Sequence, residues 1–194
     1  MTMTTRVAGI FVGGAGSRMG GVAKGLLEGP DRRPLIERWT ARFAELLLPA
    51  VLVGDVEAYR GFSLPMIADE PKGVGPLGGL IALLRHAGEG QVIVVACDMP
   101  WVSRALLERL LREQPDAPAL AAKNAGQWQP FFARYDAAVM LPIAERRLAE
   151  GRRALHETLT AAGASALALN DDEQAQLRDW DTAADVVRDG GPWS

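Results

Sequence analysis

The chain has 194 residues and a formal net charge of −3, with 48% hydrophobic and 23% charged residues. This balance is typical of a globular protein and excludes disordered and collagen-like chains. A slightly acidic chain without a long Lys or Arg run also excludes general electrostatic binding of nucleic acid, so a site for anions must be local. We expect one domain over residues 1–194.

The amino terminus and the cysteine content both favour the cytoplasm. Residues 1–6 are polar and lack the pattern of a signal peptide. No apolar run approaches the roughly 18 residues of a membrane-spanning helix. Cys97 is the only cysteine, which excludes a disulfide framework and fits a reducing compartment. We therefore expect a cytoplasmic protein without membrane or nucleic-acid partners.

An apolar strand followed by a glycine-rich loop opens the chain. Residues 7–12 are apolar and partly β-branched, which predicts a buried strand. Residues 13–25 hold six glycines together with Ser17, Arg18 and Lys24. Glycines let the backbone approach a ligand closely, successive N–H groups can form an anion site, and the two cations add charge. We interpret this loop as a polyphosphate site; a flexible connection is the alternative.

The loop departs from two familiar phosphate-binding patterns. The Walker pattern requires Ser or Thr after its lysine, but Gly25 follows Lys24. The dinucleotide fingerprint begins well at Gly14 and Gly16 but meets Met19 where a third glycine is needed. These residues therefore indicate an anion site without identifying the anion.

Strands and helices alternate along the rest of the chain. Apolar runs predict further strands at residues 50–53, 64–68, 91–97, 118–122, 129–134 and 165–169. Helical spacing and capping residues predict helices at residues 34–47, from 76 onward, 103–113, 135–150, 151–162 and after 181. The pair of strands joined by residues 123–126 predicts a hairpin, the antiparallel part of the sheet. The alternation predicts an α/β fold, with a mainly parallel sheet covered by helices on both faces.

Two aspartates follow predicted strands. Asp69 and Asp98 should therefore lie with the glycine loop at the carboxyl edge of the sheet, where such folds bind ligands. Asp98 follows an apolar central strand and could hold Mg²⁺ together with substrate phosphates; capping a turn or helix is the alternative. Gly78 and Gly79 lie in the first helical turn after Pro76. Close approach to a nucleoside and tight packing on the sheet both explain these two glycines.

Other reactive side chains fit structural roles better. His86 and His156 fall in helical stretches, and neither has a Ser or Cys partner suggested by spacing. Cys97 is expected to be a small core residue, because a buried thiol is inert. Trp39, Trp101 and Trp128 need a partner for the indole N–H and belong to the core or the rim.

Several segments resemble one family. Residues 11–20, F-V-G-G-A-G-S-R-M-G, followed by Lys24 resemble the L-A-G-G-x-S-x-R-M-G…K signature of nucleotidyltransferases that activate small phosphorylated compounds. Residues 20–27 are especially similar to the molybdenum cofactor guanylyltransferase branch. Further similar segments follow in order: Asp69 with residues 75–80 (D…G-P-L-x-G-[LM]), residues 97–100 (C-D-x-P), residues 129–135 (Q-P-x-x-A-x-Y) and residues 151–155 (G-x-R-x-[LV]).

The resemblance implies a Rossmann-like three-layer fold of the nucleotide-diphospho-sugar transferase type. It implies GTP and molybdopterin, with or without molybdenum, as substrates, Mg²⁺ as cofactor, and cofactor-delivery and acceptor proteins as partners. The implied product is molybdopterin guanine dinucleotide. The implied catalytic residues are Arg18, Lys24 and Asp98, with Asp98 as the metal ligand. The implied nucleotide-binding residues are Phe11, Val12, Gly13, Gly14, Ser17, Lys24, Asp69, Gly75 and Asp98.

Several positions differ from the branch, among them Gly54-Asp55, where the branch often carries Asn after the second strand. Ala23 precedes the lysine where an acidic residue is usual, and Asp179 and Asp181 stand where the branch has asparagines. An aspartate cannot donate the hydrogen bonds of an asparagine. Three alternatives therefore stay open: cytidylyl transfer, transfer to another phosphorylated acceptor, and a non-catalytic nucleotide-binding relative.

Overall fold

The structure is a computed structural model that describes residues 5–13 and 22–191. The predicted site residues Gly14, Ser17 and Arg18 lie outside the described residues. The described chain forms a seven-stranded sheet with the strand order β3-β2-β1-β4-β6-β5-β7. Its strands are β1 (Arg6–Phe11), β2 (Ala50–Val53), β3 (Met66–Ile67), β4 (Gln91–Ala96), β5 (Ala119–Asn124), β6 (Gln127–Asp136) and β7 (Ser165–Leu167).

The sheet is mostly parallel, as predicted. Only β6 runs against its neighbours within the described sheet, pairing antiparallel with both β4 and β5. The predicted hairpin of β5 and β6 is confirmed, and the antiparallel part of the sheet extends to β4. Because β6 is reversed, its beginning lies beside the end of β4, at the edge expected to bind ligands.

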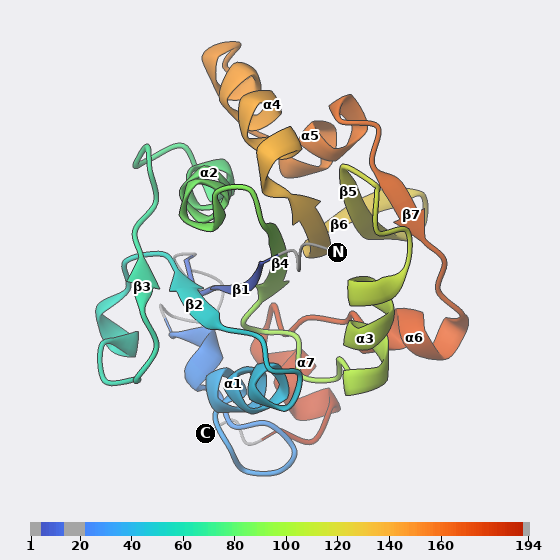
Figure 1. Cartoon of the computed structure of the whole chain (residues 1–194). Coiled ribbons are helices and arrows are strands. Elements are labelled where there is room, and N and C mark those ends of the chain that lie inside the picture. The colour runs from blue at the N-terminus through green and yellow to red at the C-terminus, as the bar shows by residue number, and fades with distance from the viewer. Residues whose placement is uncertain (1–4, 14–21, 192–194) are drawn as a thin grey trace.

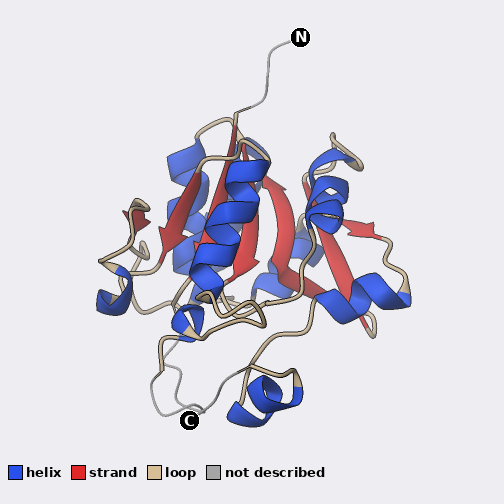
Figure 2. Ribbon diagram, turned by 90° about the horizontal axis from the view of Figure 1, so that it is seen from below, coloured by secondary structure: helices blue, strands red, loops and turns tan. Residues whose placement is uncertain are grey.

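Helices cover both faces of the sheet (Figures 1 and 2). Alternate residues of β1 separate the two cores: Ala8 and Ile10 pack toward one face, Val7 and Phe11 toward the other. This alternation follows from the two-residue period of a strand. On the first face lie α1 (Leu35–Glu45) and α3 (Arg104–Arg112). On the second face lie α2 (Pro76–Ala87), α4 (Ala137–Ala149) and α5 (Leu155–Ala161).

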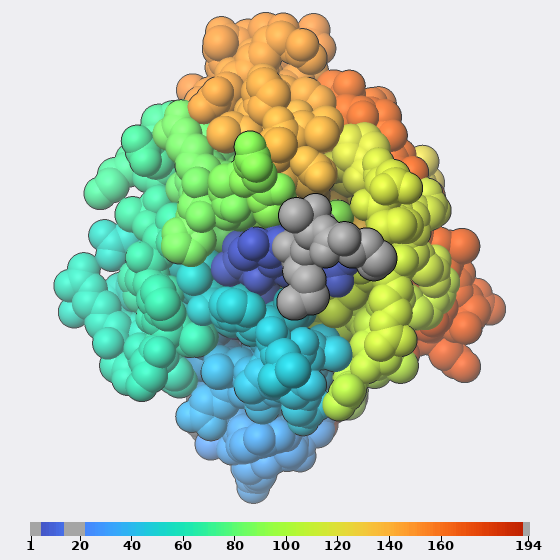
Figure 3. Space-filling model, viewed as in Figure 1, coloured from blue at the N-terminus to red at the C-terminus, as the bar shows by residue number. Residues whose placement is uncertain are grey.

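The remaining elements lie outside these two layers. They are α6 (Asp171–Gln176), α7 (Ala183–Arg188) and the short 3₁₀ helices η2 (Lys24–Leu26) and η3 (Glu57–Tyr59). In the space-filling view, the segment of β1 (blue) is visible between the segments of α2 (green) and β2 (cyan), and α4 (orange) lies at the top (Figure 3).

Two local details differ from the sequence-based expectations. Tyr135 and Asp136 extend β6 rather than beginning a helix, because they pair with the first residues of β4. The hydrophobic pattern does not predict α6, because none of its residues is buried; a capping box at Asn170 and Glu173 defines its start instead.

Among the described residues, no helix is both long enough and apolar enough to span a membrane.

Candidate active site

The predicted convergence at the carboxyl edge is confirmed by the strand register. Phe11 at the end of β1 is paired with Ala96 on one side and Val53 on the other, and Val53 is paired with Ile67. Because β1 to β4 are parallel, the segments that leave their ends meet at one edge. Asp69 follows β3 and Asp98 follows β4 at this edge.

The residues at the end of β1 are held by the sheet. The Val12 N–H donates to the Val53 carbonyl at 3.0 Å, and the Phe11 carbonyl accepts from the Cys97 N–H at 3.1 Å. Both side chains are buried, whereas Gly13 is exposed and a built Cβ at Gly13 would meet nothing within 4 Å. Gly13 is therefore the first residue of this run at which a ligand can approach the backbone.

Lys24 lies between two carboxylates at this edge. Its Nζ donates to Asp98 Oδ2 at 2.8 Å and to Asp181 Oδ1 at 2.7 Å. Burial lowers the pKa of Lys24, but the bonds to Asp181 and Asp98 outweigh burial and raise it above its ordinary value. The Lys24 ammonium group is therefore positively charged at neutral pH. Lys24 is the first residue of η2, which directly follows the glycine loop.

Asp98 lies in the turn that follows β4 and is nearly buried. The whole residue is only 8% exposed, so its carboxylate faces the interior of the site and not bulk water. Helix α3 is capped instead by Ser103, whose Oγ accepts from the Leu106 N–H at 3.2 Å. The alternative in which Asp98 caps the next helix is therefore excluded.

The carboxyl-terminal segment completes the site. The Trp180 N–H donates to the Asp98 carbonyl at 3.0 Å, which draws the following Asp181 toward Lys24. Thr182 caps α7 with its side chain, so capping does not require Asp181. The sequence pattern does not reveal this role for Asp181, because 157 residues separate it from Lys24. The only sequence signal for Asp181 was the resemblance of residues 179–184 to a segment of the family.

Asp98, Asp179 and Asp181 all place carboxyl groups near Lys24. Loss of hydration, and then the negative charges of Asp181 and Asp98, raise the pKa of Asp179. Asp98 and Asp181 belong to distant segments, yet their oxygens converge on one ammonium group. Carboxylate oxygens are hard donors, and Mg²⁺ in proteins uses one or two carboxylates together with substrate phosphates. This donor set fits Mg²⁺, although the described residues contain no group of three or more His, Cys, Asp and Glu arranged for a metal.

Asp69 and the start of α2 form the other end of the edge. Partial burial raises the pKa of Asp69, and nearby Lys72 lowers it by less. Gly75 precedes α2 with a φ of +75°, a left-handed conformation that favours glycine. Gly75 is exposed, whereas Gly78 and Gly79 are buried within α2.

Cys97 has the structural role expected of it. Cys97 is buried, and burial raises the pKa of its thiol to about 12, so the thiol stays protonated. His86 and His156 are exposed residues of α2 and α5. Among the described residues, the acid–base chemistry of the edge therefore rests on Lys24 and the aspartates.

The sequence of this chain is similar to those of known nucleotidyltransferases. A family model described as the MobA-like NTP transferase domain matches residues 8–176. A molybdenum cofactor guanylyltransferase of Pseudomonas putida (strain GB-1) is 35% identical over 169 residues, covering 84% of this chain and 87% of that protein. A protein of the same name from Serratia proteamaculans is 32% identical and covers 92% and 91% of the two chains.

Solved structures share the fold. Molybdopterin-guanine dinucleotide biosynthesis protein A of Archaeoglobus fulgidus aligns with a TM-score of 0.75 at 26% identity, covering 95% of this chain and 96% of that one. A 2-C-methyl-D-erythritol 4-phosphate cytidylyltransferase of Thermus thermophilus aligns with a TM-score of 0.65 at 18% identity, covering 96% of each chain. The second likeness concerns the fold alone.

Proposed function

This chain belongs to the MobA-like NTP transferase family of nucleotidyltransferases, and from that premise we propose that it transfers GMP from GTP to the terminal phosphate of molybdopterin. The observation that supports the proposal most directly is the pairing of Lys24 with Asp98 and Asp181 at the carboxyl edge. Its relatives named guanylyltransferases at 32–38% identity support GTP as the donor.

The proposed reaction exchanges one phosphoanhydride bond for another. An oxygen of the molybdopterin phosphate attacks the α-phosphorus of GTP, and the bond between the α-phosphorus and the bridging oxygen to the β-phosphorus breaks. The products are molybdopterin guanine dinucleotide and pyrophosphate. Such transfers depend mainly on positioning and on neutralising negative charge.

The described residues divide this work. Gly13 offers backbone at which the phosphates can approach, and Lys24 supplies a permanent positive charge for them. Asp69 and Gly75, on the β3–α2 side, are positioned to contact the nucleoside. Asp98, with Asp181, would hold Mg²⁺, which when bound neutralises phosphate charge and orients the reacting groups.

Lys24 must change partners during this reaction. In the structure its ammonium group is bound by two carboxylates, both within 2.8 Å. A cation bound by the same carboxylates would compete with Lys24 and let it turn toward the phosphates. Gly14, Ser17 and Arg18 belong to the same proposal through their motif alone.

Release of pyrophosphate tests the proposal. Wild-type protein with GTP, Mg²⁺ and molybdopterin should release pyrophosphate in a coupled assay. Asp98→Ala should reduce the rate by at least about 10²-fold, because removing one charge-stabilising group from such a site costs roughly 3–4 kcal/mol. Asp116→Ala, an exposed aspartate in the turn before β5, is the matched control and should keep the wild-type rate.

Circular dichroism should show the same folded signal for both variants. If the wild type releases no pyrophosphate with these three components, the chain is a non-catalytic nucleotide-binding relative instead. If Asp98→Ala retains full activity, the placement of the metal and phosphate site at Asp98 is wrong.

A further inference from the structure

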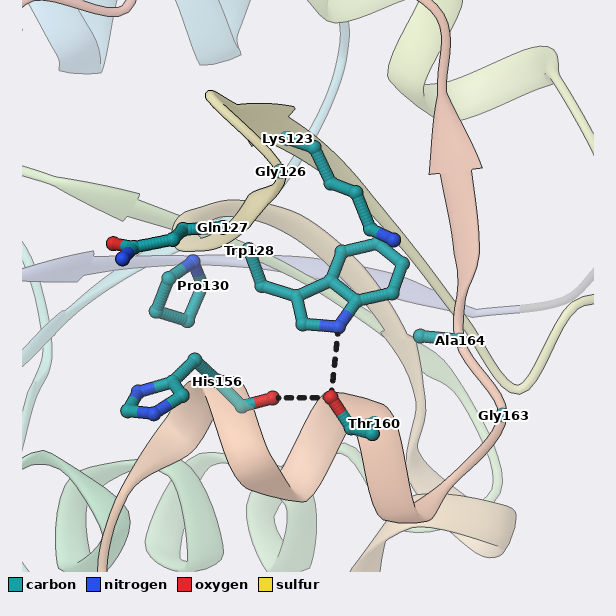
Figure 4. Close-up of a pocket in the computed structure, with 9 residues that line it drawn as sticks. All are labelled: Lys123, Gly126, Gln127, Trp128, Pro130, His156, Thr160, Gly163 and Ala164. Carbon is teal, nitrogen blue, oxygen red and sulfur yellow. Dashed lines mark hydrogen bonds between the residues drawn. The ribbon is translucent and has the colours of Figure 1, made fainter.

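A second pocket lies on the β6 side of the sheet. It has a volume of about 530 Å³ and is enclosed by the β5–β6 hairpin and α5 (Figure 4). This volume falls within the roughly 300–1,000 Å³ of small-molecule sites. The pocket contains Pro130 from the motif at residues 129–135 and lies beside the motif at residues 151–155, which opens α5. Neither motif has a role in the site around Lys24.

Trp128 forms a fixed wall of this pocket. Its indole N–H donates to Thr160 Oγ1 at 3.0 Å, and that hydroxyl donates to the His156 carbonyl at 3.1 Å (Figure 4). The Lys123 ammonium lies 4.1 Å from the centre of the Trp128 ring. The hydrogen bond to Thr160 of α5 therefore orients the Trp128 ring, and the Lys123 ammonium group lies over one face of that ring.

The residues that line the pocket select a class of ligand. Among the described residues that line it, Lys123 and His156 can carry a positive charge and none has a carboxylate. Such a lining favours a neutral or anionic ligand over a cationic one. A half-exposed tryptophan beside an imidazole and a proline ring suits a flat heterocycle, which can stack on these surfaces. The chemistry thus matches a planar, nitrogen-containing ring system attached to an anion.

The strand order assigns this pocket to one of the two substrates. Phe11, Asp69 and Gly75 lie on one side of the sheet, with β1, β3 and α2. Asp98 follows the central strand β4. The pocket lies on the other side of β4, at β6 and β5. Because β6 is reversed, Trp128 lies toward the same edge as Asp98. The Phe11 and Phe131 rings, 5.3 Å apart, join the two halves. Group transfer needs the two substrates on opposite sides of the transferred phosphorus.

We infer that the pocket at Trp128 binds the ring system of the acceptor, a fused pterin-type heterocycle carrying a phosphate. This inference rests on the proposed function and extends it by assigning residues to the acceptor. Trp128 stacks on the heterocycle, His156 borders it, and Lys123 attracts the anion. None of these three residues belongs to the motifs by which the sequence resembles its family.

Titration calorimetry with two probes tests the inference. The probes are 6-hydroxymethylpterin monophosphate, as the stable heterocyclic phosphate, and GTP. Trp128→Leu should weaken binding of the pterin phosphate about tenfold, within the range found for a base stacked on an aromatic ring, and leave GTP binding unchanged. Trp128→Phe keeps a stacking ring while losing the bond to Thr160, so it should retain most of the affinity.

A matched histidine pair provides the control. His156→Ala should weaken binding of the pterin phosphate about threefold, whereas His86→Ala, on the exposed end of α2, should not change it. Thermal unfolding without ligand verifies that each variant is folded. The inference is overturned if wild-type protein does not bind the pterin phosphate, if Trp128→Leu binds it as well as wild type, or if Trp128→Leu weakens GTP binding equally.

Failure of the inference and failure of the proposed function give different results. Pyrophosphate release that does not depend on Trp128 rejects the pocket and supports the transfer reaction. Binding of the pterin phosphate that depends on Trp128, in a protein that releases no pyrophosphate, supports the pocket and rejects the transfer reaction.

Discussion

Gly79 lies where α2 meets the ends of β1 and β2. A Cβ built at this position would lie 2.9 Å from both Phe11 Cε1 and Val53 Cγ1, and 3.0 Å from Asp69 Oδ1. Real Cβ atoms rarely have contacts this short, so a larger residue must displace these neighbours. Packing of the helix on the sheet therefore explains Gly79, and the same packing places Asp69 beside α2. Of the two sequence-based explanations for this glycine, tight packing is confirmed.

Substitution of Gly79 should be costly. We expect Gly79→Ala to lower the free energy of unfolding by about 1–3 kcal/mol, because overpacking strains a dense core. Urea denaturation measures the change. Gly61→Ala is the control, since a Cβ built there meets nothing within 4 Å, and it should change stability by less than about 0.5 kcal/mol. Equal effects at the two positions would contradict the packing argument.

At the scale of elements, the segment ending in α7 is the one that connects the fold to the site. Trp180 is fully buried, and its indole N–H donates to Asp189 Oδ2 at 3.0 Å. The Trp101 indole donates to the same oxygen at 3.1 Å. One carboxylate at the end of α7 thus joins the loop after β4 to the carboxyl-terminal segment. Because Trp180 also binds the Asp98 carbonyl, this anchoring holds Asp181 near Lys24.

Removal of the Asp189 carboxylate should loosen this element. Asp189→Ala leaves two indole N–H groups without their acceptor, so we expect a loss of roughly 2 kcal/mol in the free energy of unfolding at pH 7. Activity should fall as well, because Asp181 is no longer held in place. Asp189→Asn keeps an oxygen acceptor and should cost less. Chemical denaturation of the three proteins compares them directly.

The same carboxylate makes stability depend on pH. Arg188, followed by the Trp101 and Trp180 bonds, lowers the pKa of Asp189 to about 2. A lowered pKa favours the ionised form in the folded state, so the contribution is complete above the ordinary aspartate pKa of about 4. It should be lost as the pH falls from about 4 to about 2. The stability difference between wild type and Asp189→Asn should shrink over that interval; a constant difference would contradict the assignment.

For the whole molecule, nucleotide binding should appear as stabilisation of the folded state. A ligand at about 100 times its Kd stabilises the folded protein by roughly 2.7 kcal/mol. For a protein of this size the corresponding rise in Tm is about 5–10 °C. We expect GTP with Mg²⁺ to give this shift, and CTP or ATP at the same concentration to give a smaller one. Thermal-shift titration checks this; equal shifts, or a preference for CTP, would reject guanine specificity.

Local patterns in the sequence determined most of the fold. The apolar runs at residues 50–53 and 91–97 correspond to β2 and β4, and Pro76 does begin α2. A strand that is buried on both faces is apolar throughout, whereas a helix has apolar residues at the period of one buried stripe. Both patterns can therefore be recognised from the sequence alone. The carboxyl edge could also be predicted, because parallel strands end together. The placement of Asp69 and Asp98 at this edge follows from this rule alone.

Only the tertiary structure decided which distant residues meet. The reversal of β6 between β4 and β5 brings Trp128 toward the carboxyl edge of the parallel strands, and the hydrogen bond from the Trp180 N–H to the Asp98 carbonyl places Asp181 beside Lys24. Neither contact has a local signature, because hydrophobic periodicity records which face of an element is buried and not which element covers it. The sequence by itself therefore determined most of the elements and the edge of the sheet at which the candidate site lies, while strand order and long-range hydrogen bonds decided which side chains complete that site.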